Sequence, residues 1–89
     1  MTLEVHVDGN SLAGLFHDLF GREMTEEECC CDSCGTVSPL GAVLVYKGPA
    51  DVIRCPACRN VLMVIVASAN GLQVRFQSLR WMAFTGRAE

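Results

Sequence analysis

The sequence predicts a small α+β fold, in which an antiparallel β-sheet follows one short amphipathic helix. Three observations lead to this prediction: apolar residues recur with helical spacing near the start, later runs have the composition of strands, and two C-x2-C pairs flank a strand-rich insert. A chain of 89 residues has room for one hydrophobic core, so residues 1–89 are expected to form a single domain. A domain this short often needs a bound metal or disulfides for stability.

Residues 3–21 are expected to form a strand and then the helix. Apolar and polar residues alternate over residues 3–7, as in a strand with one buried face, and Asp8 begins a turn. Either Asn10 or Ser11 is expected to cap the helix. Apolar residues then follow the i, i+3, i+4, i+7, i+8 spacing of an amphipathic helix, and Gly21 is the expected stop; they are Leu12, Leu15, Phe16, Leu19 and Phe20. A helix of about ten residues is marginal alone, so it must pack on its own domain or on a partner.

The segment before the cysteines resembles a capping box. Thr25 and Glu28 are three residues apart in "TEEE", which predicts a single helical turn leading into the cysteine run.

Strands are expected on both sides of the second cysteine pair. Residues 43–46 and 52–54 read as a hairpin whose turn contains Gly48 and Pro49. The apolar, β-branched run 61–67 predicts a strand covered on both faces, and residues 72–77 alternate as a half-buried strand does after the turn "SANG". The last segment, residues 79–84, shifts phase at Ser78, as a bulge or corner would.

Two cysteine pairs carry the chemistry of the sequence. Cys31-x2-Cys34 and Cys55-x2-Cys58 are separated by 20 residues, which is a zinc-ribbon spacing. Two intervening residues let both sulfurs of a pair approach one ion to about 2.3 Å, and zinc takes four thiolates in a tetrahedron. The sequence therefore predicts a zinc ribbon over residues 29–84, with one structural Zn²⁺ held by Cys31, Cys34, Cys55 and Cys58.

Cys29 and Cys30 are left over by this assignment. Cys30 and Cys34 are separated by three residues, a spacing that some zinc sites accept, so Cys30 could replace Cys31 as a ligand. Cys31 is the predicted ligand. Two extra thiols beside a metal also raise the alternative of a thiol redox sensor. The acidic surroundings oppose it, because Glu26, Glu27, Glu28 and Asp32 raise the pKa of a thiol rather than lower it.

Iron is the rival metal, because four thiolates also suit a rubredoxin-like electron carrier. Arg59 stands where rubredoxins usually have Gly and aromatic residues are few, so zinc is favoured. Four cysteines close the coordination shell, whereas catalytic zinc keeps a position for water. His6 and His17 are expected at the surface, and no catalytic residue or small-molecule substrate is predicted.

The expected role is that of a protein-interaction module. Charge is divided unevenly: residues 1–36 hold eight acidic residues against Arg22, and residues 37–89 hold six basic residues against two acidic ones. A nucleic-acid-binding ribbon of transcription or translation is the alternative, carried by the arginines of the second part, notably Arg54, Arg75 and Arg80, with Trp81. The net charge of -3 and the single lysine argue against it.

The chain resembles a bacterial family of small uncharacterised zinc-ribbon proteins, known only as a domain of unknown function. The matching segments, over residues 7–82, are "DGNSLAGLFHDLFG" with "MT", "CDSCG", a strand ending at Tyr46, "RCPAC" and "VLMVIV". The resemblance implies a cytoplasmic protein with a metal-binding ribbon and implies no substrate. Residues 1–9 lack the features of a secretory leader, and the longest strongly apolar run, 61–69, is too short for a membrane span of about 20 residues. A reducing compartment and no membrane partner are expected.

Overall fold

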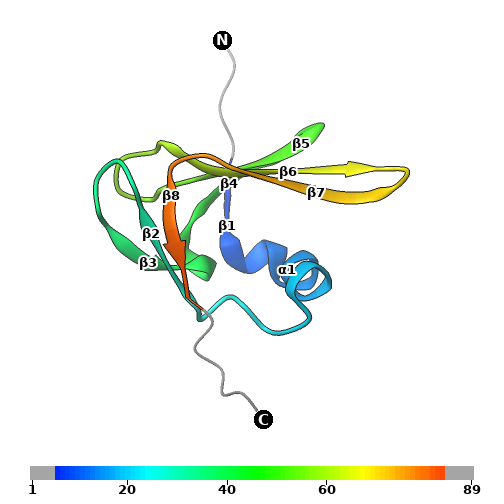
Figure 1. The fold of residues 1–89 in the computed structure, drawn as a ribbon, viewed down its shortest axis with the longest axis horizontal. Coiled ribbons are helices and arrows are strands. Elements are labelled where there is room, and N and C mark those ends of the chain that lie inside the picture. The colour runs from blue at the N-terminus through cyan, green and yellow to red at the C-terminus, as the bar shows by residue number, and fades with distance from the viewer. Residues whose placement is uncertain (1–5, 84–89) are drawn as a thin grey trace.

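The computed structural model describes residues 6–83 and contains one α-helix and two antiparallel sheets (Figure 1). The helical segments are the 3-10 turn η1 (Gly9–Leu12), the helix α1 (Ala13–Phe20) and the 3-10 turn η2 (Leu40–Ala42). The strands are β1 (Val7–Asp8), β2 (Glu28–Cys31), β3 (Val37–Pro39), β4 (Leu44–Tyr46), β5 (Ala50–Arg54), β6 (Val61–Ser68), β7 (Gly71–Phe76) and β8 (Leu79–Met82). The five-stranded sheet has the order β1-β4-β5-β6-β7, and the three-stranded sheet has the order β3-β2-β8. The prediction of one sheet was therefore too simple.

The helix begins differently from the prediction. The side chain of Asp8, not of Asn10 or Ser11, accepts the capping hydrogen bond, from the backbone N–H of Asn10 at 3.1 Å. The chain first makes the 3-10 turn η1, which places the cap one turn earlier, and α1 then starts at Ala13 without a side-chain cap. Gly21 ends α1 in the left-handed conformation, as predicted, and its N–H donates to His17 O at 2.7 Å. Residues 3–5 of the predicted first strand lie outside the described residues.

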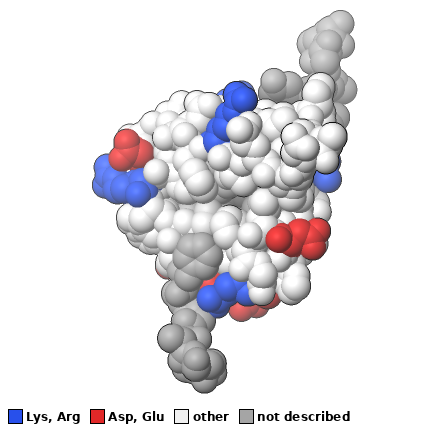
Figure 2. All heavy atoms as spheres, turned by 45° about the vertical axis from the view of Figure 1, so that its right-hand side comes forward, with Lys and Arg blue, Asp and Glu red and all other residues white. Residues whose placement is uncertain are grey.

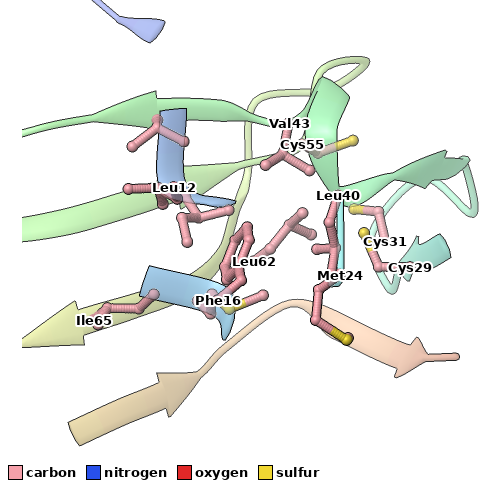
Figure 3. Close-up of a cluster of buried hydrophobic side chains, with 13 residues drawn as sticks. Leu12, Phe16, Met24, Cys29, Cys31, Leu40, Val43, Cys55, Leu62 and Ile65 are labelled. Atoms are coloured by element: carbon pink, nitrogen blue, oxygen red, sulfur yellow. The ribbon is translucent and has the colours of Figure 1, made fainter. Parts of the chain in front are cut away.

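Helix α1 packs on its own domain. Phe16 is fully buried and Leu12 nearly so, in a cluster with side chains from both sheets (Figure 3). The buried members of this core are Leu12, Phe16, Met24, Cys29, Cys31, Leu40, Val43, Val45, Ile53, Cys55, Leu62, Met63 and Ile65. The apolar stripe of the helix is thus used within the chain, because burying it offsets the instability of so short a helix.

The cysteine run itself is a strand, which the sequence analysis did not predict. One hydrogen-bonded turn precedes it, in which the N–H of Glu27 donates to Met24 O at 3.0 Å, and β2 starts at Glu28. The backbone N–H of Thr25 donates to the carboxylate of Glu23, and no capping bond between Thr25 and Glu28 is formed among the bonds described. The expected capping box is therefore wrong. Strand β2 is the central strand of the second sheet and pairs with β3 and β8.

The remaining strands lie where the sequence predicted them, but β7 is more exposed than the half-buried strand predicted there, because only Val74 of its residues is half-buried. Strands β4 and β5 form the first hairpin, and β6 and β7 form the second, closed by the two residues Ala69 and Asn70. The predicted burial of β6 on both faces is met in part: Leu62, Met63 and Ile65 are buried, whereas Val64 and Val66 are half-buried. The predicted corner at Ser78 exists, because the chain leaves the first sheet there and β8 joins the second. Among residues 6–83, no helix is long and apolar enough to cross a membrane.

Candidate metal centre

The first cysteine loop, residues 31–36, starts at the end of β2. The N–H of Cys31 donates to Thr36 O at 3.0 Å, and the N–H of Gly35 donates to Cys31 O at 2.9 Å. Gly35 has a φ of 76°, a left-handed conformation that glycine adopts without strain. These bonds turn the chain back on itself, so Cys34 returns toward Cys31.

The second cysteine loop, residues 55–60, follows β5 and repeats this geometry. The N–H of Cys55 donates to Asn60 O at 2.9 Å, and the N–H of Arg59 donates to Cys55 O at 2.9 Å. Arg59 occupies the position of Gly35 and has a φ of 69°. The sequence analysis noted an arginine where rubredoxins have glycine. The backbone nevertheless adopts the same left-handed turn there, at a cost of roughly 1–2 kcal/mol for a residue with a Cβ.

The two loops bring the four predicted sulfurs together. All four Sγ atoms lie within 4.8 Å of one another. Cys31 Sγ is 3.6 Å from Cys58 Sγ, and Cys34 Sγ is 3.7 Å from Cys55 Sγ. A tetrahedral zinc with bonds of about 2.3 Å separates its sulfur ligands by about 3.8 Å. The donor set and its spacing therefore fit one tetrahedral metal ion.

Each pair supplies one buried and one exposed cysteine. Cys31 and Cys55 are each 1% exposed and belong to the hydrophobic core, whereas Cys34 and Cys58 are exposed. Figure 3 shows Cys31 and Cys55 at the edge of the core, next to Leu40 and Val43. A metal ion held here would thus join the core to both loops.

Backbone and hydroxyl donors surround the sulfurs. The N–H of Ala57 donates to Cys55 Sγ at 3.3 Å. Hydrogen bonds from the side chain and the backbone of Thr36 lower the pKa of the Cys34 thiol to about 6. A backbone hydrogen bond from Asn60 acts in the same direction on Cys58, but desolvation and the three other cysteines outweigh it and raise the pKa of Cys58 to about 12. A metal ion must displace that proton, so metal affinity is expected to fall as pH falls.

Cys29 and Cys30 lie outside the four-sulfur cluster. Cys29 is buried in the core, and burial raises the pKa of its thiol to about 11. The direction of this shift agrees with the prediction, but desolvation is its main cause rather than the acidic neighbours. Cys30 is 5% exposed, and its Sγ lies 3.7 Å from the carbonyl oxygens of Cys31 and Gly35. The structure thus leaves Cys31 as the member of the run that faces the other pair.

The histidines are absent from the cluster. His6 and His17 are both exposed, as predicted, and the ring of His6 lies 5.3 Å from the ring of Tyr46. An exposed ion pair ties the first cysteine loop to β8: Arg80 Nε is 3.0 Å from Asp32 Oδ1. This ion pair and the sulfur contact of Thr36 were not predicted from the sequence. The separation of Asp32 and Arg80 in the sequence does not predict an ion pair, because the two side chains meet only when β8 pairs with β2.

Comparison with known proteins yields one match. The family of unknown function DUF6510 matches residues 3–87 of the chain. Neither a curated protein nor a solved structure matches.

Proposed function

We propose, from the premise that this chain belongs to the DUF6510 family of unknown function, that it is a non-catalytic zinc-binding protein. In this proposal the two cysteine loops are the knuckles of a zinc ribbon, and Cys31, Cys34, Cys55 and Cys58 hold one structural ion. The ribbon serves as a protein-interaction module.

The spacing of the four sulfurs carries this proposal. Distances of 3.6 and 3.7 Å between sulfurs of different pairs match the edge of a tetrathiolate tetrahedron. Four thiolates leave no position for a water or a substrate, whereas catalytic zinc sites keep one position open. The ion would therefore supply stability to the fold and no reaction step.

Zinc is proposed over iron because thiolate ligands suit both metals, while the aromatic residues typical of rubredoxins are few in this chain. The six free cysteines point to a reducing compartment, so a cytoplasmic location is proposed.

A protein partner is favoured over nucleic acid because three of the arginines already have partners within the chain. The Arg54 guanidinium lies 5.5 Å from the ring centroid of Tyr46, Arg75 donates to Gln73, and Arg80 pairs with Asp32. Figure 2 shows small, separated groups of basic and acidic atoms on a largely uncharged face. Nucleic-acid-binding surfaces instead gather basic residues in one patch.

The experiment is elemental analysis of freshly purified protein together with affinity capture from its host. One equivalent of zinc and the recovery of a specific protein are expected. Less than one equivalent of metal in soluble, folded protein would overturn the metal assignment. A nucleic acid retained in a salt-sensitive manner, without a protein partner, would overturn the interaction role.

A further inference from the structure

Strand β7 is an edge of the five-stranded sheet, and no other strand within residues 6–83 pairs with its outer side. It contains six residues, whereas the other edge strands, β1, β3 and β8, contain two, three and four. A long uncovered edge offers unpaired backbone groups to another strand, and proteins usually keep such edges short or guard them.

The outward groups of this edge are identified by its pairing with β6. The two-residue hairpin loop makes Ser68 and Gly71 a hydrogen-bonded pair, and the N–H of Gln77 donates to Leu62 O. Because the direction of backbone bonding alternates along an antiparallel strand, Gln73 and Arg75 also bond to β6. The N–H and C=O groups of Leu72, Val74 and Phe76 therefore point away from the sheet. These groups are the ones available to a further strand.

The side chains on this edge include exposed apolar groups. Leu72 is 39% exposed and Phe76 is 59% exposed, and each is two residues away from Val74. All three side chains lie on the face of the sheet that carries Met63 and Ile65. Gln73 and Arg75 lie on the opposite face and are exposed. In the strand "LQVRF", a polar residue therefore follows Val74 in each direction (Gln73 and Arg75), and an apolar residue comes next (Leu72 and Phe76).

We propose that a second copy of this chain pairs antiparallel with β7 about a two-fold axis at Val74. In that register Val74 lies opposite Val74 of the other copy, Leu72 lies opposite Phe76, and Gln73 lies opposite Arg75. Every outward N–H of one strand then meets an outward carbonyl of the other. Apolar side chains meet apolar ones, and the amide of Gln73 meets a guanidinium, as it already does within one chain at 3.1 Å. The two sheets become one continuous sheet.

Neighbouring registers are less favourable. An axis at Arg75 places Arg75 opposite its own copy, and like charges directly opposite each other are destabilising. An axis at Gln73 places Phe76 opposite Asn70 in the hairpin loop. The pairing centred on Val74 is the register that uses the whole strand without a charge conflict. The strand that pairs in this register has only six residues in each copy, so the dimer is expected to be reversible and dependent on concentration.

The test is sedimentation velocity of the metal-loaded protein over a wide concentration range. A reversible monomer–dimer equilibrium is expected. Gln73→Glu places two symmetric Glu–Arg pairs across the interface and is expected to tighten dimerisation roughly 2- to 30-fold. Gln77→Glu is the matched control: it makes the same charge change at a position opposite Gly71, so it is not expected to tighten the dimer. Leu72→Lys is expected to weaken the dimer, because it removes the apolar contact with Phe76.

A monomer at every concentration would overturn the proposal, and a strand of another protein would then be the candidate for this edge. Tightening by Gln77→Glu instead of Gln73→Glu would overturn the register. The inference goes beyond the proposed function, and metal content is measured on the same samples. A fully metal-loaded monomer would therefore refute the dimer while leaving the structural role of the metal intact.

Discussion

Replacing Cys31 with serine is expected to remove one of four metal ligands, whereas the same change at Cys30 is expected to leave the metal in place. Apparent zinc binding in structural sites is worth about 10–16 kcal/mol, so an equal share for each ligand is roughly 2.5–4 kcal/mol, or about a 10²–10³-fold loss of affinity. Total folding stability is about 5–15 kcal/mol, so this loss is a large fraction of it and Cys31→Ser should also lower the unfolding temperature markedly. Cys30→Ser changes a thiol whose described hydrogen bonds are to the carbonyl oxygens of Cys31 and Gly35, and it should cost about 1–2 kcal/mol.

Metal content after gel filtration in the presence of a competing chelator measures the first effect, and thermal unfolding by circular dichroism measures the second. Cys30 is the appropriate control because it lies on the same strand and one residue away. Retention of one equivalent of metal by Cys31→Ser, with its loss in Cys30→Ser, would refute the ligand assignment. It would favour the x3 spacing that the sequence left open.

Three further predictions test the surroundings of the site and the fold. Removal of the metal by a chelator is expected to lower the unfolding temperature and to make the thiol of Cys34, which is exposed, available to alkylation. Cys29 is 1% exposed and is expected to react only when the protein unfolds. Labelling of Cys29 before unfolding would contradict its place in the core. Gly35→Ala is expected to lower the free energy of unfolding by about 1–2 kcal/mol. The added Cβ meets no atom within 4 Å, so the loss comes from the φ of 76°, which is unfavourable for alanine. An unchanged denaturant midpoint would refute this cause. Gly9→Ala is expected to destabilise the fold severely, because the added Cβ would overlap Leu40 O. Its control is Gly14→Ala in α1, which should stabilise the protein by about 0.5–1 kcal/mol because the added Cβ meets no atom within 4 Å. Equal melting temperatures for the two variants would contradict the contact between η1 and η2.

Local chemistry made several features predictable from the sequence. The helical spacing of Leu12 and Phe16, the stop at Gly21 and the hairpins around residues 47–49 and 69–70 depend on interactions between residues close in the chain. The C-x2-C spacing belongs to the same class, because a tight turn by itself places both sulfurs of a pair near one ion. The sequence was therefore sufficient to nominate the four cysteines that the fold brings together.

Contacts between distant segments were decided only by the tertiary structure. Cys29, Cys30 and Cys31 are chemically identical in the sequence. Cys30 differs from the other two because successive side chains of β2 point to opposite faces. Cys31 differs from Cys29 because it is the last residue of β2, where the first cysteine loop begins. The pairing of β2 with β3 and β8 makes the cysteine run a strand, which was not predicted, and it brings Arg80 to Asp32 across 48 residues. Residue spacing encodes local geometry, whereas the choice of strand neighbours depends on burying a shared core, which no single segment specifies.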